Sequence, residues 1–169
     1  MEQFRSSARN GLSGFTIVEL VVVIMILGIL AAVAGPRFVG RGAFDARGFL
    51  DQVVAAVQYA RQQAVAQRRQ VCVAVTVNSL SITRAPLPPP GGACDGTALT
   101  NPATGAAYAV AAPTGVTIAG IAGTALPLNL AFDQLGRPTA AASLRIQGED
   151  NHCLSVEAET GYVRTIACP

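Results

Sequence analysis

The sequence predicts an α+β protein in which a long N-terminal hydrophobic α-helix, kinked near Pro36, packs on an antiparallel β-sheet head. Three observations lead to this prediction: an apolar run near the N-terminus, an amphipathic stripe with helical spacing after it, and short segments with the two-residue period of strands beyond residue 70. The chain has 169 residues, which suits one domain plus an anchor. We expect four segments: a leader at 1–14, a membrane-spanning helix at 15–35, an amphipathic continuation of this stem helix at 36–70, and the β head at 71–169.

The apolar run follows a polar leader that contains Arg5 and Arg9. Residues 15–34 carry a single charge, Glu19. As a helix, these residues would extend about 30 Å, which matches the hydrocarbon core of a bilayer. A carboxylate inside such a span costs about 3 kcal/mol on insertion scales, so Glu19 is a candidate functional residue.

A secretory signal peptide is the alternative for this run. Ala32-Val33-Ala34 has the small-x-small pattern of a cleavage site, and cutting after it would release a soluble secreted β protein. However, the run exceeds the usual apolar region of about 7–15 residues, and cleavage would leave Glu19 unexplained. The sequence therefore favours a retained helix.

The leader arginines also predict the orientation of the chain. Arg5 and Arg9 should stay in the cytoplasm, so that the chain crosses the inner membrane once and places its head in the periplasm. Because that compartment is oxidising, the four cysteines are expected to form two disulfides.

A second, amphipathic helix is predicted after Gly35-Pro36, where proline should interrupt or kink the first one. Arg61, Arg68 and Arg69 are expected to form its solvated C-terminal end, where cations suit the helix dipole. The apolar stripe of this helix should lie on a sheet and consists of Phe49, Val53, Val57, Ala60 and Ala64, widened by Leu50, Val54 and Val65.

From Val71 the apolar residues alternate with a period of two, which is typical of strands. Gly, Pro, Asn and Asp clusters separate several such segments, so we expect an antiparallel arrangement with short connections. The predicted strands span residues 71–77, 80–84, 107–111, 116–118, 128–132, 144–147, 153–157 and 162–167.

The residues around the start of the apolar run resemble a known signal. Gly14 followed by Phe15-Thr16-Ile17-Val18-Glu19-Leu20 resembles the class III signal sequence of type IV pilins and type II secretion pseudopilins. The resemblance implies that a prepilin peptidase cuts between Gly14 and Phe15 and methylates the new amine of Phe15. It also implies that Glu19 meets the N-terminal amine of a neighbouring subunit, and that Pro36 is the helix-kinking proline of many pilins.

Elementary electrostatics agrees with this role for Glu19. Cleavage would create an ammonium at Phe15, one helical turn before Glu19. A carboxylate and an ammonium about 4 Å apart attract each other by roughly 4 kcal/mol at an effective dielectric constant near 20. A pair formed between neighbouring subunits could therefore set their stagger. The alternative is that Glu19 reaches the membrane surface from the helix start.

The C-terminal part carries a second resemblance. Phe132-Asp133-Gln134-Leu135-Gly136, the following strands and Gly161-Tyr162-Val163 look like the GspH/FimT family of minor pseudopilins. There, Phe132 would pack in the core and Gly136 would adopt a turn conformation barred to most residues. The resemblances together imply a minor pilin of an MSHA-like type IV pilus. The alternative is a GspH-type pseudopilin of a type II secretion system.

This family implies a defined set of partners. They are other pilin or pseudopilin subunits, the prepilin peptidase, an inner-membrane assembly platform, and membrane lipid before assembly. The finished subunit would then sit in a pilus or pseudopilus filament.

Four cysteines allow three pairings. Cys153 and Cys168 end the last two predicted strands, so a hairpin of these strands would bring them together. This favours Cys153–Cys168 and leaves Cys72–Cys94 by exclusion. A C-terminal disulfide also resembles the closed terminal loop of many type IV pilins.

The sequence offers little for catalysis, and we expect neither an enzyme nor a cofactor. All twelve basic residues are arginine, which excludes lysine chemistry, and there is no C-x-x-C pair that could bind zinc with the single histidine. His152, near Asp150, is expected in a polar hairpin turn. A DNA-binding FimT-like pilin is disfavoured because Glu157 and Glu159 accompany Arg164 in the tail, and the net charge is only +2.

Overall fold

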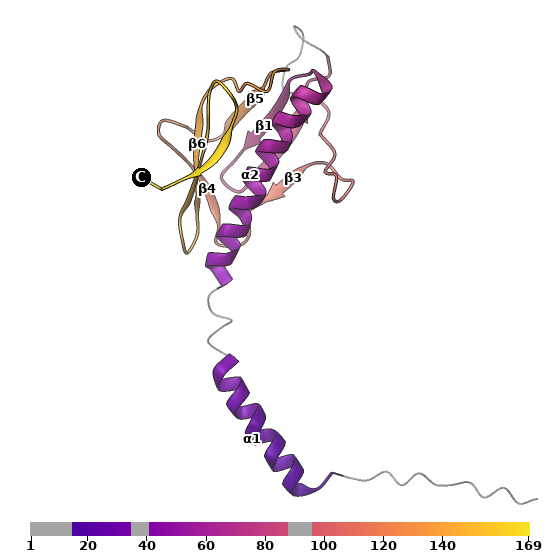
Figure 1. Cartoon of the computed structure of the whole chain (residues 1–169), viewed down its shortest axis with the longest axis vertical. Helices are drawn as coiled ribbons and strands as arrows, with labels where there is room; N and C mark the ends of the chain where they lie inside the picture. Colours follow the sequence, from indigo (N-terminus) through magenta and orange to yellow (C-terminus); the bar gives the residue numbers. More distant parts are fainter. Residues whose placement is uncertain (1–14, 35–40, 88–95) are drawn as a thin grey trace, which may run out of the picture. The chain divides into compact units, whose positions relative to one another are not determined.

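The computed structural model describes residues 15–34, 41–87 and 96–169, which fall into two compact units, Met1–Gly40 and Arg41–Pro169 (Figure 1). Helix α1, Ile17–Ala34, is the described element of the first unit. The second unit contains helix α2, Arg41–Gln67, and the strands. Among the described residues, no helix is both long and apolar enough to cross a membrane. The predicted span at 15–35 stays a prediction, and the predicted kink at Pro36 lies outside the described residues.

Helix α2 buries the apolar stripe that its sequence predicts. Phe49, Val53, Val57, Ala60 and Ala64 are almost inaccessible to solvent, as is Leu50, while Val54 is partly buried. These side chains recur every three or four residues and therefore share one face of the helix. The prediction that Val65 widens the stripe is wrong, because its side chain is 47% exposed.

The C-terminus of α2 is closed by a Schellman motif with an unusual residue in it. Arg68 adopts the left-handed conformation, with φ of 50°. The Arg69 amide then donates to the Ala64 carbonyl at 3.2 Å, and the Arg68 amide donates to the Val65 carbonyl at 3.3 Å. This pattern satisfies two carbonyl groups at the helix end, and it usually places glycine where this chain has Arg68.

Each predicted strand is present in the described residues; the strand at 128–132 has the predicted bounds, and the ends of the others differ from the prediction by at most three residues. Turns and loops with Asn, Asp, Gly and Pro separate the strands, as the composition indicates. The strands are β1 Val71–Val75, β2 Ser79–Arg84, β3 Ala109–Ala111, β4 Thr117–Ile121, β5 Leu128–Phe132, β6 Ala142–Gln147, β7 His152–Val156 and β8 Val163–Ile166.

The head contains two antiparallel sheets in its described residues, whereas one was expected. The orders are β3-β2-β1-β5 and β4-β6-β7-β8, each with four strands. β1 pairs on one side with β2, its neighbour in sequence, and on the other side with β5 from much later in the chain. The period of two predicts where strands occur but contains no information about such long-range partners, so it could not predict the division into two sheets.

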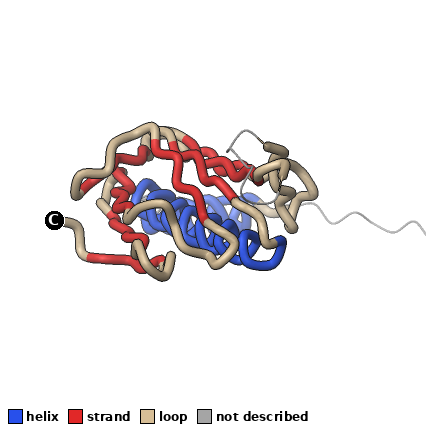
Figure 2. Tube along the Cα trace, turned by 90° about the horizontal axis from the view of Figure 1, so that it is seen from above, coloured by secondary structure: helices blue, strands red, loops and turns tan. Residues whose placement is uncertain are grey.

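The core lies between α2 and the two sheets. The strands curve around the helix when the chain is seen from above (Figure 2), and α2 contacts strands of both sheets. Because Phe49 and Leu50 on the helix join the same buried cluster as strand residues of both sheets, α2 and the sheets form one unit. The largest fully buried strand side chains are Phe132, Leu80, Ile82, Ile118, Leu144, Ile146 and Leu154.

We expect Arg68→Gly to stabilise the head by about 0.5–1 kcal/mol, because glycine adopts the left-handed conformation without the steric cost that arginine carries there. Urea unfolding of the purified full chain in detergent, followed by circular dichroism, measures this change. Ala66→Gly is the control, since residue 66 is an exposed helical position, and it should lose about 1 kcal/mol. A destabilising Arg68→Gly would contradict the assignment of this motif.

Candidate functional site

Helix α1 begins at a side-chain cap supplied by Thr16. Its hydroxyl oxygen accepts a hydrogen bond from the Glu19 amide at 3.2 Å, and its carbonyl accepts the first helical bond from the Leu20 amide at 3.1 Å. Thr16 is therefore the N-cap, and Glu19 is the third helical residue, which is the threonine–x–x–glutamate spacing of a capping box. The sequence contained this signal, but the role of Thr16 was not predicted.

Glu19 lies in the first turn of α1, where its side chain is exposed. A carboxylate at this end of a helix is favoured by the partial positive charge of the unpaired amides. No ion pair involving Glu19 occurs within the described ranges. The carboxylate thus has a local reason to lie at the helix start and is also free to meet a cation from another molecule.

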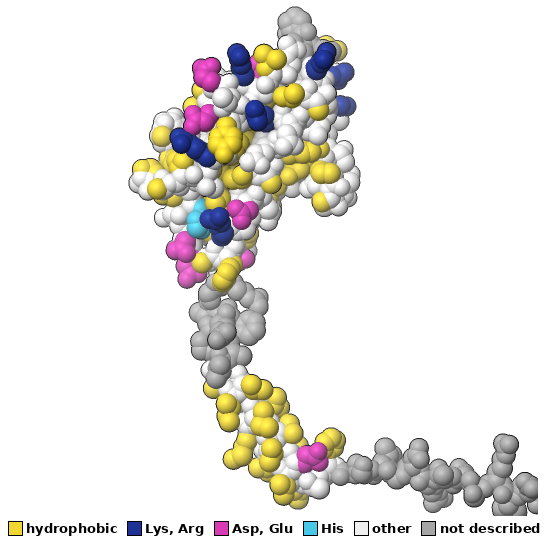
Figure 3. All heavy atoms as spheres, viewed as in Figure 1, with side chains coloured by type: hydrophobic (Ala, Val, Ile, Leu, Met, Phe, Trp, Pro, Cys, Tyr) yellow, Lys and Arg dark blue, Asp and Glu magenta, His cyan; other side chains and the backbone are white. Residues whose placement is uncertain are grey.

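The large apolar side chains from Phe15 to Leu30 are all exposed, and Figure 3 shows them covering the visible face of α1. Phe15 is 82% exposed and Ile17 is 83% exposed, and the large residues that follow, through Leu30, are at least 43% exposed. A helix that is apolar on all sides is stable only when something covers it, because exposed apolar surface costs about 25 cal/mol per Å². An apolar surface of this kind is stabilised when lipid or other apolar helices cover it.

Of the predicted N-terminal site residues, the structure describes Phe15 and Glu19, which flank the cap in sequence. Gly14, the other side of the predicted cleavage point, lies outside the described residues. The roles predicted for Gly14, Phe15 and Glu19 stay predictions.

In the head, two turns meet the C-terminal third of α2. The Arg61 Nε donates to the Gly136 carbonyl at 3.3 Å, and Gly161 lies directly against the same carbonyl. Gly136 has φ of 79° and Gly161 has φ of 64°, so both take the conformation that favours glycine. The turn expected at Gly136 and the buried position expected for Phe132 are confirmed.

The turn that contains Gly136 is held by Asp133. Its Oδ1 accepts hydrogen bonds from the Leu135 and Arg137 amides, each at 2.8 Å. Such side-chain bonds to the following backbone are how aspartate stabilises a turn. Leu135, which precedes Gly136 in this turn, is 64% exposed.

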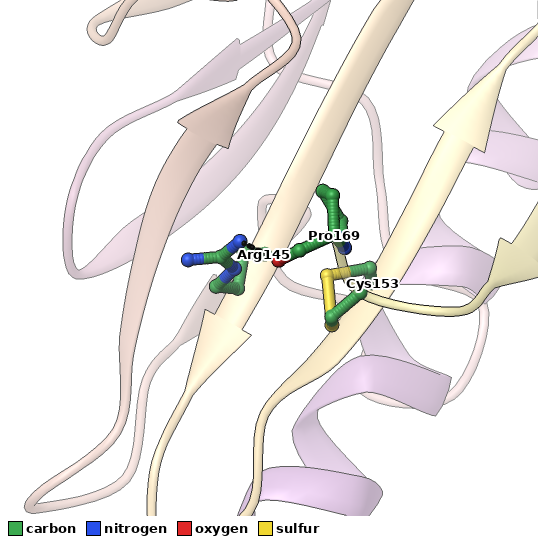
Figure 4. The surroundings of a disulfide bond; sticks show 4 residues. Arg145, Cys153 and Pro169 are labelled. Atoms are coloured by element: carbon green, nitrogen blue, oxygen red, sulfur yellow. Dashed lines mark hydrogen bonds between the residues drawn. A yellow bond between two sulfur atoms is a disulfide. The ribbon is translucent and has the colours of Figure 1, made fainter.

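The C-terminal disulfide Cys153–Cys168 is confirmed (Figure 4). β7 and β8 form the expected hairpin, in which Cys153 pairs with Ile166, two residues before Cys168. Arg145 pairs with Cys153 on the neighbouring strand, and its Nη2 donates to the Pro169 carbonyl at 2.8 Å. The disulfide and Arg145 together hold the tail against the sheet.

For the second predicted disulfide, Cys72–Cys94, the structure describes only one of the two cysteines. Cys72 lies on β1 and is not a free cysteine, whereas Cys94 lies outside the described residues. This pairing stays a prediction.

A metal centre among the described residues would need several ligating side chains close together. No group of three His, Cys, Asp or Glu side chains is close enough to hold a metal ion in that part of the chain. His152 is the first residue of β7, not a turn residue as expected, and it lines a cavity of about 390 Å³ with Arg47 and Cys168. Within the described ranges, no hydrogen bond joins His152 of β7 to Asp150.

Two stacked tyrosines border the long loop after β2. The rings of Tyr59 and Tyr108 have centroids 5.1 Å apart, and burial, with a smaller contribution from Tyr59, raises the pKa of Tyr108 above its usual value of 10.0. A phenol whose pKa is raised stays protonated at neutral pH, so it cannot act as a base there. The pair anchors the loop, since the Tyr59 hydroxyl donates to the Thr100 carbonyl at 3.0 Å.

Comparisons with known proteins agree with these features. A family model described as "Type II transport protein GspH" matches residues 50–161, more than half of the chain. A second model, described as "Prokaryotic N-terminal methylation motif", matches residues 9–35. No curated protein matches the chain.

Two solved structures have a similar fold. The type IV minor pilin FimU of Pseudomonas aeruginosa aligns with a TM-score of 0.53 at 17% identity, covering 74% of this chain and 90% of FimU. The minor pseudopilin EpsH from the Type 2 Secretion System of Vibrio cholerae aligns with a TM-score of 0.52 at 15% identity, covering 75% of this chain and 96% of EpsH. At these low sequence identities, the structural similarity shows a shared fold alone.

We predict that Thr16→Ala makes the Glu19 amide exchange with solvent about fivefold faster, because losing an N-cap costs about 1 kcal/mol of helix stability. Hydrogen exchange of the full chain in detergent micelles, followed by NMR, measures this rate. Thr16→Ser should behave like the unchanged protein, since serine caps as well. Equal exchange in all three proteins would show that Thr16 is not a cap.

Gly161→Ala should destabilise the head by about 1–3 kcal/mol more than Gly115→Ala, because a methyl group at residue 161 would overlap the Gly136 carbonyl. Gly115 is a matched control, since it also has positive φ, 84°, but has nothing within 4 Å of its missing Cβ. Urea midpoints of the two variants in detergent give the difference. Equal losses would mean that backbone conformation alone, and not the contact between the turns, requires glycine at 161.

Proposed function

The chain belongs to the family of the type II transport protein GspH, and from this premise we propose that it is a minor pilin of an MSHA-like type IV pilus. In this role it is a structural subunit that assembles with other pilins through its N-terminal helix. One observation carries the proposal: α1 exposes apolar side chains on all sides and has a single charge, Glu19, in its first turn, inside a matched N-terminal methylation motif.

The proposed maturation step creates the partner of this charge. Prepilin peptidase cuts between Gly14 and Phe15 and methylates the new amine of Phe15. Thr16 then becomes the second residue of the mature chain, and its capping bond to Glu19 survives the cut. The cap holds Glu19 about 6 Å along the helix from Phe15, so each subunit presents one cation and one carboxylate at a fixed spacing.

Assembly then replaces one apolar surrounding with another. Before assembly, α1 and the residues around it lie in the inner membrane, with the leader in the cytoplasm and the head in the periplasm; Arg5 and Arg9 support this orientation. The assembly platform moves the subunit into the filament, where neighbouring helices cover α1. A Glu19 that meets the Phe15 ammonium of a neighbour neutralises two charges that are costly when buried alone. Bending near Pro36 would help the helix to fit.

A type II secretion pseudopilus is the second candidate filament. The match to the GspH family supports it, whereas the C-terminal disulfide supports the pilus, because it resembles the closed terminal loop of many type IV pilins. Deleting the gene in its host separates the two. A pilus subunit should change the number of surface pili, and a pseudopilus subunit should change the secretion of folded enzymes.

The N-terminus and intact mass of the protein, recovered from its native membranes without reduction, test the proposed processing. We expect an N-methylated Phe15 and a mass that lacks the hydrogens of all four thiols. A start at Gly35 would instead mean an exported soluble protein, and it would remove any role for Glu19 in assembly.

Glu19→Ala should be processed normally but should enter filaments at least about tenfold less, because losing even 1.4 kcal/mol of pairing changes an equilibrium tenfold. Immunoblots of membranes and sheared filaments measure both quantities. Glu159→Ala, at an exposed position in the head, is the control and should assemble normally.

Glu19→Gln separates charge pairing from helix capping. Glutamine can take the place of glutamate in a capping box but cannot pair with an ammonium. We therefore expect it to fail like Glu19→Ala. Normal incorporation of Glu19→Gln would refute the charge-pairing role and leave only the cap.

A further inference from the structure

A row of polar side chains on α2 borders a cavity in the head. Tyr59, Gln63 and Gln67 are spaced four residues apart, so they lie along one side of the helix. Together with residues 97–100 and with Arg84 at the end of β2, they line a cavity of about 240 Å³. Sites for drug-sized molecules usually measure about 300–1,000 Å³, so this cavity suits a smaller ligand that contains one ring.

A chain of hydrogen bonds orders the polar side chains of this cavity. The Arg84 Nη1 donates to the Gln67 Oε1 at 3.1 Å, and the Gln67 Nε2 donates to the Gln63 Oε1 at 2.7 Å. Both glutamine oxygens therefore accept hydrogen bonds within the chain. The Gln63 Nε2 and the rest of the Arg84 guanidinium are left as the groups that can donate to a ligand.

The opposite wall of the cavity uses its backbone acceptors internally. The Thr97 carbonyl accepts a hydrogen bond from the Arg84 amide at 3.0 Å. The Thr100 carbonyl accepts one from the Tyr59 hydroxyl, also at 3.0 Å. A ligand that must donate several N–H groups, such as a peptide backbone, therefore fits this wall poorly. A ligand that mainly accepts hydrogen bonds fits it better.

The surroundings of the cavity are positively charged. Residues 52–94 include four arginines and no Asp or Glu, and no acidic side chain lines the cavity. The Arg69 Nη1 donates to the Pro86 carbonyl at 3.1 Å, which brings a second guanidinium to the Arg84 end. No ion pair involves Arg69 or Arg84 within the described ranges. A carboxylate on a ligand can therefore pair with Arg84 without displacing another one.

Tyr59 gives the cavity an aromatic wall. Its ring stacks on Tyr108 and its hydroxyl is bonded to the Thr100 carbonyl, so the ring is held in place before a ligand arrives. A sugar ring has an apolar face of C–H groups and hydroxyls around its rim, and it therefore matches an aromatic side chain that lies beside amide donors. A bare inorganic anion would leave this wall unused.

We propose that this cavity, the Arg84 cavity (Tyr59, Gln63, Gln67, Arg84 and residues 97–100), binds an acidic sugar, which is a pyranose that carries a carboxylate. Arg84 pairs with the carboxylate, the Gln63 amide donates to a ring hydroxyl, and the Tyr59 ring packs against C–H groups. Such a site adds ligand binding to the proposed structural role and does not depend on it.

Titration of the full chain in detergent with glucuronate tests the site. NMR follows the backbone amides of residues 97–100 and the side-chain amide of Gln63, and we expect these signals to shift saturably. Glucose lacks the carboxylate and acetate lacks the ring, so each should bind at least about tenfold more weakly, which corresponds to the loss of one good contact. N-acetylalanine, which imitates a peptide C-terminus, should also bind at least about tenfold more weakly.

The other results of this titration would overturn the proposal. Equal binding of acetate would mean a simple anion site, and equal binding of N-acetylalanine would mean a site for a peptide end. Equal binding of glucose would mean that the charge of Arg84 plays no part. No saturable shift with glucuronate would mean that the cavity does not hold an acidic sugar.

Removal of one charge identifies the partner of the carboxylate. Arg84→Gln should weaken glucuronate binding at least about tenfold and leave the weak binding of glucose unchanged, because only the charged contact is lost. Arg137→Gln is the matched control, since Arg137 is exposed and does not line the cavity. Equal affinities of the two variants for glucuronate would refute the role of Arg84.

A variant that fills the cavity tests its location without changing α2 or Arg84. Ala98 is exposed and lines the cavity, so Ala98→Phe should reduce glucuronate binding at least about tenfold while the urea midpoint of the head stays unchanged. Ala103→Phe, at an exposed position outside the lining, is the control and should bind normally. Normal binding by Ala98→Phe would place the ligand elsewhere and overturn the proposal.

Discussion

Burial of one face of α2 is the constraint on which the head depends. The face that runs from Phe49 through Val57 to Ala64 is inaccessible to solvent, and strands of both sheets pack on it. Two four-stranded sheets have apolar faces that need a common cover, and a helix of 27 residues is long enough to provide one. The strands therefore take their places around α2, and the turns that join them are brought to its two ends.

Helix α1 differs from α2, because nothing in the described structure covers its apolar side chains. At the start of this helix, the Thr16 hydroxyl oxygen accepts a hydrogen bond from the Glu19 amide. A fixed first turn has a consequence for assembly: it gives the carboxylate a defined place relative to Phe15 before any partner arrives. The conformational entropy of that turn is then not lost at the moment when subunits meet.

The turns at the C-terminal end of α2 link stability to surface chemistry. Gly136 and Gly161 approach Arg61 closely because neither carries a Cβ, and this contact places the neighbouring Leu135 and Tyr162 side chains at the surface. The same turns that pack against the end of α2 thus carry exposed Leu135 and Tyr162 side chains. Elsewhere on the head, the Cys153–Cys168 disulfide and Arg145 keep the C-terminal tail on the sheet.

The sequence by itself determined the apolar N-terminal helix, the buried stripe of α2, the position of each strand and the Cys153–Cys168 pair, because these follow from local periodicity and from a hairpin between neighbouring strands. Only the tertiary structure decided that β5 joins β1, that the strands divide into two sheets, and that Val65 is exposed beside Gly136. It also placed Arg61 against both glycine turns. Such contacts join residues far apart in the chain, and their choice depends on how all apolar faces are covered at once, which no local pattern contains.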